Sequence, residues 1–73
     1  MAKKGGSAVY RVTEVIGTST QSWEDAARNA VKTASKTLRD LRIAEVTKLD
    51  VKIEDGKVTQ FRARLSLSFK YGA

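Results

Sequence analysis

The C-terminal part of the chain has the clearest pattern of apolar and polar positions. From Phe61 to Tyr71 every second residue is apolar, and the residues between them are Arg, Ser or Lys. A period of two is typical of a strand that has one face on a core and the other towards water or a charged cavity. This segment is therefore predicted to be a strand that is buried on one side.

Two earlier segments are also predicted to be strands because they are rich in β-branched and aromatic residues. Residues 8–16 mix apolar and polar groups on both faces, and Gly17 is expected to end that strand. In residues 43–54 the apolar positions of one parity are Ile43, Leu49, Val51 and Ile53. Glu45 and Val46 interrupt this alternation, which predicts a bend or a bulge near them.

Between these two strands the spacing changes to three and four residues, which predicts a helix. The apolar positions run from Trp23 to Leu41, so we expect one helix of about five turns that ends near Asp40. Ser22 followed by an acid at Asp25 is close to a capping box at the start of this helix. Most of the apolar stripe is alanine, which buries little area and attaches the helix weakly.

The elements follow the order β-α-β-β, and the Asp55-Gly56 pair predicts a tight hairpin between the last two strands. The expected fold class is α+β, a three-stranded antiparallel sheet packed on one helix. We expect a single domain at residues 8–73, preceded by a flexible basic tail at residues 1–7.

The small size of the chain indicates self-association. A core of 73 residues rarely stabilises a fold by more than a few kcal/mol, and this chain has no Cys for a disulfide. The predicted sheet would also leave two exposed edges, which proteins usually blunt or pair. A closed homo-oligomer answers both problems. The number of copies does not follow from these observations.

Composition argues against catalysis and against membrane insertion. Without Cys or His the chain has no thiol nucleophile, no imidazole base and no nitrogen ligand for a transition metal. No paired carboxylates suggest acid–base chemistry, and the apolar runs are far shorter than a membrane span. Residues 1–7 do not resemble a signal peptide, so we expect a soluble protein of the cytoplasm.

The net charge of +6 raises the alternative of nucleic-acid binding. Arg28, Lys32, Lys36 and Arg39 recur at helical spacing, either as a solvated face or as a track for phosphates. The solvated face is the favoured interpretation, because the sheet lacks the interleaved aromatic residues on which single-stranded nucleic acids stack.

Segments of this chain match one known family in order and with nearly no gaps. They lie at residues 9–12, 15–19, 22–27, 30–31, 34–39, 45–46, 53–58 and 68–70. Together they resemble the dodecins from Val9 to about Tyr71. The resemblance implies a hollow dodecamer of β-α-β-β subunits that binds small molecules, most often flavins, in pockets between subunits.

The positions that line the flavin pocket in the family differ here. The family segment Trp-Phe-Glu-Val, whose Trp stacks on the flavin, reads Ile43-Ala44-Glu45-Val46. The family's flavin-binding Gln falls on Arg62, an Arg falls on Asp50, and the closing Arg falls on Lys70. An aliphatic side chain cannot replace the stacking ring, so flavin is not the expected ligand. A flavin-sequestering dodecin with a non-standard pocket is the alternative.

This combination of residues resembles the flavin-free branch known as calcium dodecins. The resemblance implies a cation site in place of flavin, with Asp50 as the candidate ligand. Calcium takes six to eight oxygen ligands, so several symmetry-related copies of Asp50, with backbone carbonyls and waters, would have to contribute. The alternative for Asp50 is a surface ion pair with Lys48, Lys52 or an Arg of another chain.

The basic residues on the polar face of the last predicted strand, and the single tryptophan, each have an expected role. Arg62, Arg64 and Lys70 either make a cationic cavity that attracts phosphate-bearing molecules or pair with acids across the strands, namely Asp50, Glu45 and Glu14. Trp23 is expected to cover the start of the helix rather than to bind a ligand. The predicted function is a non-enzymatic assembly that binds and stores a small ligand, with itself as its main partner.

Overall fold

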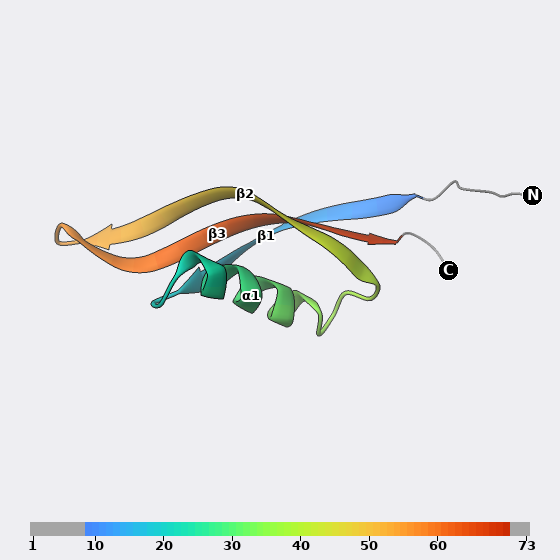
Figure 1. The fold of residues 1–73 in the computed structure, drawn as a ribbon, viewed down its shortest axis with the longest axis horizontal. Helices are drawn as coiled ribbons and strands as arrows, with labels where there is room; N and C mark the ends of the chain where they lie inside the picture. Colours follow the sequence, from blue (N-terminus) through green and yellow to red (C-terminus); the bar gives the residue numbers. More distant parts are fainter. Residues whose placement is uncertain (1–8, 71–73) are drawn as a thin grey trace, which may run out of the picture.

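A long antiparallel hairpin forms most of the sheet, and one helix covers part of one face (Figure 1). The structure is a computed structural model that describes residues 9–70; the predicted tail at residues 1–7 and the end of the last predicted strand lie outside the described residues. The elements are β1 (Tyr10–Ser19), α1 (Trp23–Ala34), β2 (Leu41–Glu54) and β3 (Lys57–Lys70). The strand order is β1-β3-β2, with both pairs antiparallel. The predicted α+β class and the β-α-β-β order are confirmed.

The predicted tight turn joins β2 to β3. Glu54 pairs with Lys57, and the two residues between them, Asp55 and Gly56, have φ angles of 52° and 74°. Two positive φ angles in a two-residue loop match the twist of antiparallel strands, and Asp-Gly adopts them readily. The hairpin extends past the start of the helix (Figure 1).

Strand β1 continues through Gly17 to Ser19, so the prediction that Gly17 ends this strand is wrong. Gly17 is buried opposite Ala63, directly under the helix. A Cβ atom at this position would overlap the carbonyl oxygen of Ala26 and lie 2.7 Å from the Cβ of Ala30. The glycine therefore serves the close approach of helix and sheet rather than a turn.

The helix is shorter than predicted and ends at Ala34 instead of near Asp40. Ser35 donates its hydroxyl to the Val31 carbonyl at 2.7 Å, and the Lys36 amide bonds to Thr33 in a tightened last turn. Serine and threonine side chains that compete for helical carbonyls favour such an ending. Lys36 and Arg39 therefore lie beyond the helix, and the predicted four-residue basic stripe on one helix face is wrong.

The start of the helix follows the prediction. Ser22 has an extended backbone, and its hydroxyl accepts a hydrogen bond from the Asp25 amide at 3.0 Å. The Asp25 carboxylate accepts from the buried Ser19 hydroxyl at 2.7 Å, which ties the helix to the end of β1. This N-cap satisfies an amide that would otherwise lack a partner.

Strand β2 contains the predicted bulge. Its register with β3 shifts between Val46 and Lys48, and again near each end of the strand. Because of the central shift, Ile43 lies opposite Ser68 whereas Leu49 lies opposite the buried Ala63. The prediction that Ile43 and Leu49 share one face is wrong, because a bulge reverses the alternation.

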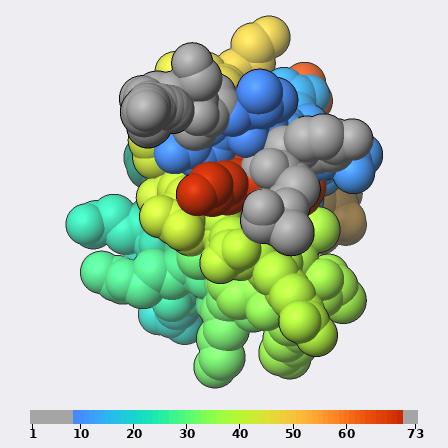
Figure 2. Space-filling view, turned by 90° about the vertical axis from the view of Figure 1, so that its right-hand side faces the viewer, coloured from blue at the N-terminus to red at the C-terminus, as the bar shows by residue number. Residues whose placement is uncertain are grey.

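The core of the described residues is small. Six apolar residues are buried, and only two of them are larger than alanine; they are Ala26, Ala30, Ala34, Ala63, Leu65 and Leu67. In contrast, Val12 is 62% exposed, Ile43 63% and Leu49 52%. Seen from the end, the helix and the segment after it lie together on one side of the strands (Figure 2). Much of the large apolar surface of one chain is therefore left uncovered.

No helix in residues 9–70 is long and apolar enough to cross a membrane.

We expect Gly17→Ala to destabilise the protein by about 1–3 kcal/mol, because the added methyl group forces the helix away from β1 and β3. The midpoint of thermal unfolding at a fixed protein concentration measures this loss. Thr18→Ala, at the exposed neighbouring position, is the control and should change stability by less than about 0.5 kcal/mol. Equal midpoints for the two variants would contradict the role given to Gly17.

Candidate functional site

The residues predicted for the ligand pocket lie in two places along the β2–β3 hairpin. Near the start of β2, Ile43 is opposite Ser68 and Ala44 is opposite Leu67. Asp50, which is opposite Arg62, follows Ile43 by seven residues, or roughly 23 Å of strand. One chain therefore does not bring Ile43 and Asp50 together.

Most of these positions share the face of the sheet that points away from the helix, called the open face here. Its residues pair across the strands on the side opposite to the buried Ala63, Leu65 and Leu67. The open face includes Val12, Glu14, Ile16, Ile43, Glu45, Lys48, Asp50, Arg62, Arg64 and Ser66. Ala44 lies on the other face, and Lys70 lies opposite Tyr10 at the end of β3. The open face thus combines exposed apolar groups with charges of both signs.

Asp50 and Arg62 form a forked ion pair on the open face. The Nε of Arg62 donates to Oδ1 of Asp50 at 2.7 Å, and Nη2 donates to Oδ2 at 3.3 Å. The pKa of the Arg62 guanidinium is raised above its ordinary value, first by this hydrogen bond and then by the charge of Asp50. The Arg62 side chain remains 37% exposed and the Asp50 side chain 55% exposed. Both oxygens of the predicted calcium ligand are therefore bound to arginine in this chain.

The other cross-strand ion pairs considered from the sequence do not form. Within residues 9–70, neither Glu14 nor Glu45 makes an ion pair with Arg64 or Lys70. Lys52 pairs with Glu54 at 3.8 Å, and not with Asp50. Among the described residues of one chain, Arg62 is the basic residue of β3 that pairs with an acid.

Trp23 connects the start of the helix to the same end of the sheet. Its indole Nε1 donates to the backbone carbonyl of Asp50 at 3.0 Å, and its ring meets Phe61 edge-on with 5.2 Å between centroids. This agrees with the expectation that Trp23 covers the start of the helix. The contact with Asp50 spans 27 positions in the sequence, so no local pattern could have predicted it.

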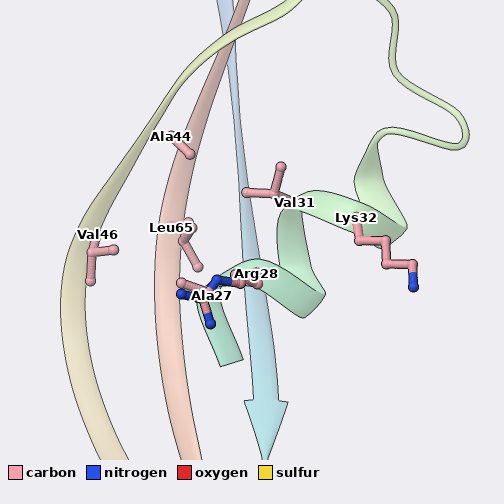
Figure 3. A pocket seen from close by; sticks show the side chains of 7 residues that line it. All are labelled: Ala27, Arg28, Val31, Lys32, Ala44, Val46 and Leu65. Atoms are coloured by element: carbon pink, nitrogen blue, oxygen red, sulfur yellow. The ribbon is translucent and has the colours of Figure 1, made fainter. Parts of the chain in front are cut away.

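An open groove runs between α1 and β2, because the helix lies mainly over β1 and β3 and leaves most of β2 uncovered. The groove has a volume of about 380 Å³, and Figure 3 shows its strand residues Ala44, Val46 and Leu65 facing Ala27 and Val31 of the helix. Arg28 and Lys32 border it. Of these residues only Ala44 was predicted as a pocket residue, since the groove depends on where the helix crosses the sheet.

The acidic residues of one chain do not form a calcium site by themselves. Within residues 9–70 no three acidic residues lie close enough together to hold a metal ion. Asp50 supplies a single carboxylate, which Arg62 occupies, and calcium requires six to eight oxygen ligands. The donor chemistry of Asp50 fits calcium only where carboxylates from several copies meet.

Comparison with known proteins settles the family. The family model for dodecin matches residues 9–72. The chain belongs to the dodecin family. It is 44% identical over 64 residues to a protein named calcium dodecin from Mycobacterium tuberculosis, an alignment that covers 86% of this chain and 89% of that one.

Solved dodecin structures share the fold. The structure of dodecin from Streptomyces coelicolor aligns with a TM-score of 0.84 and 47% identity, covering 90% of this chain and 94% of that one. The solved calcium dodecin of M. tuberculosis, described as having a novel calcium-binding site, aligns with a TM-score of 0.79 and 38% identity. That alignment covers 89% of this chain and 93% of that one. The predicted resemblance to dodecins is confirmed.

For this dodecin we expect Phe61→Leu to lower stability by about 0.5–1.5 kcal/mol beyond the loss of buried area, because the edge-on contact with Trp23 is removed. The emission of the single tryptophan should also move to longer wavelength as its ring becomes wetter. Phe69→Leu is the matched control, since Phe69 lies on the same strand and makes no ring contact with Trp23. An equal emission shift in both variants would show that the Phe61 contact does not set the environment of Trp23.

Proposed function

We propose that this dodecin is a non-catalytic shell of twelve chains that binds a small ligand between subunits, and that this ligand is calcium rather than flavin. The observation that carries the assembly is the imbalance between the small core and the large apolar side chains left at the surface. Burying such groups is the dominant favourable contribution to association. The number twelve comes from the family.

The free sheet edges and the groove support the same assembly. Within residues 9–70 of one chain, β1 and β2 each have a neighbouring strand on one side, which is β3, so the outer side of each has no strand beside it. Exposed edges of this length favour pairing with, or coverage by, another chain. The groove beside Val46 and Ala44 leaves apolar side chains that a neighbouring subunit would cover. Pockets for ligands would then arise where subunits meet.

The residue at the family's stacking position argues against flavin. Ile43 is an exposed aliphatic side chain, and it cannot supply the stacking geometry that an aromatic ring provides. Trp23 does not compensate, because it lies near the Asp50 end of β2 and its indole is bound to the Asp50 carbonyl. Arg62 stands where the flavin-binding members have Gln, and its side chain makes an ion pair with Asp50.

Asp50 supports calcium as the ligand. Its carboxylate is on the open face and more than half exposed, so copies from several subunits can approach one ion. Carboxylate oxygens are the ligands that calcium prefers, and symmetry would multiply the single Asp50 of each chain. The relative from M. tuberculosis is named calcium dodecin, which is consistent with this assignment. A bound calcium would join subunits electrostatically and would supply no redox or acid–base chemistry.

Native mass spectrometry of freshly purified protein tests the assembly and the absence of flavin together. With 8.0 kDa for one chain, a dodecamer has a mass of 12 × 8.0 kDa, or about 96 kDa. We expect the dodecamer in the mass spectrum and no flavin band in an absorbance scan of the same sample. A compact monomer that unfolds cooperatively would overturn the assembly, and stoichiometric flavin would overturn the choice of ligand.

Calcium-dependent stabilisation tests the role of Asp50. Calcium that binds only the folded assembly should raise the unfolding midpoint by several degrees, at about 4–8 °C per kcal/mol for a domain of this size. Asp50→Asn should abolish this response. Asp55→Asn removes the same charge but preserves the turn, because Asn-Gly also suits positive φ angles, and it should respond like the wild type. A full response from Asp50→Asn would place the calcium elsewhere.

A further inference from the structure

The two outer edges of the sheet differ in how regular they are. Strand β1 pairs with β3 through consecutive residues from Tyr10 to Ser19 without a register shift. Strand β2, on the other edge, shifts its register three times. Bulges twist an edge strand and interrupt its row of backbone groups, which blunts the edge against pairing. Among residues 9–70, β1 therefore offers the regular edge to which another strand can be added.

The helix limits how much of the β1 edge another strand can reach. Asn29 of α1 donates from Nδ2 to the backbone carbonyl of Thr18 at 3.1 Å, so a helix side chain already uses a backbone group of β1 there. Gly17 is buried under the same helix. In contrast, six of the seven residues from Tyr10 to Ile16 are exposed. The accessible edge is thus this segment of seven residues, and Thr13 lies at its centre.

We propose that two copies of this chain join β1 to β1, antiparallel and centred on Thr13, and form one continuous sheet across a twofold axis. This inference rests on the proposed assembly and names the edge through which two of its copies meet. A twofold axis brings the same surface of both chains together, so the surface has to complement itself. With Thr13 on the axis, Thr13 faces its own copy and Tyr10 lies opposite Ile16 of the second copy.

The side chains of β1 suit this register. By alternation along the strand, Tyr10 and Ile16 share the open face, and each is 47% exposed in one chain. An aromatic side chain opposite a β-branched one stabilises a strand pair, as do two threonines opposite each other at Thr13. The register keeps the two Glu14 carboxylates diagonal to each other, whereas an axis at Glu14 would place them directly opposite, which is destabilising. An axis at Val12 would shorten the paired segment.

The antiparallel arrangement leaves room for both helices. In each chain α1 packs against Gly17, which lies beyond the segment that pairs. Figure 1 shows the first half of β1, in blue, extending past the end of α1. Because the two joined strands run in opposite directions, the two helices lie at opposite ends of the joined edge. Neither helix therefore blocks the approach of the second copy.

A groove beside the β1 edge suits one side chain of the second copy. It lies between β1 and α1, has a volume of about 620 Å³, and includes Val15, Thr33 and Ala34 in its lining. In the proposed register Arg11 of the second copy lies opposite Val15, next to this groove. The helix ends at Ala34, and the dipole of a helix favours a cation at its carbonyl end.

A single introduced thiol tests the junction, because the sequence contains no Cys. Thr13→Cys places two thiols directly opposite each other, where Cα atoms of paired strands are about 4.5–5.5 Å apart, within the range that a disulfide spans. Mild oxidation of the assembled protein should give a linked pair of 2 × 8.0 kDa, or about 16 kDa, on a denaturing gel. Thr18→Cys, at another exposed threonine of β1, is the matched control. Its two copies would lie about 33 Å apart along the strands, so it should stay unlinked.

Two neighbouring variants test the register. Val12→Cys and Glu14→Cys each face their own copy directly if the axis lies one residue away from Thr13. In the proposed register their copies are diagonal, about 7–8 Å apart, so both should link more slowly than Thr13→Cys. Faster linking through either of them would overturn the proposed register.

Hydrogen exchange of the unmodified protein tests the same junction if a Cys variant does not assemble. In a strand with a free outer side, every second amide points away from the sheet and exchanges quickly. Pairing with a second copy should slow the exchange of every amide from Arg11 to Val15. Fast exchange at alternate residues of this segment would contradict the inference.

Native mass spectrometry of the same samples separates this inference from the proposed assembly. A species of 12 × 8.0 kDa, or about 96 kDa, without linkage through Thr13→Cys overturns the β1 junction and leaves the assembly standing. A single chain as the main species overturns both. A species of the same dodecameric mass that contains linked pairs supports the junction.

Discussion

The close contact between the helix and the sheet is the interaction on which the rest of the structure depends. Gly17 and Ala63 on the strands face Ala26 and Ala30 on the helix, and these positions are all buried. Small side chains allow the two backbones to approach closely, but each of them removes little apolar area from water. The contact therefore fixes where the helix lies while leaving the chain with a weak core.

The placement of the helix decides which parts of the sheet remain open. Because α1 packs over β1 and β3, the apolar side chains of β2 on that side border a groove instead of a core. The bulges of β2 turn Ile43 to the opposite face, where Val12 and Ile16 are also exposed. Both faces of the protomer thus present apolar surface, and the function proposed for this dodecin belongs to the interfaces between copies rather than to one chain.

The charged end of the hairpin brings together Asp50 and Arg62, two of the positions predicted to differ from the flavin-binding dodecins. Asp50 and Arg62 occupy directly paired positions in adjacent strands, so the backbone register alone brings their charges together. Trp23 then holds the Asp50 backbone from the helix side. This end of the hairpin therefore carries a carboxylate held in an arginine fork.

The sequence by itself determined the order of the elements, the strict alternation of β3, the helix cap at Ser22 and the Asp-Gly turn, because each depends on residues that are neighbours along the chain. The family match was also readable from it, whereas the role of Ile43 at the stacking position stays a prediction. Tertiary structure alone decided that Gly17 lies inside a strand, since its reason is a helix that packs against it. It also decided the end of the helix at Ala34, the face that Ile43 occupies and the contacts of Asp50 with Arg62 and Trp23. These features depend on cross-strand register and on packing between segments far apart in the chain, which no local pattern encodes.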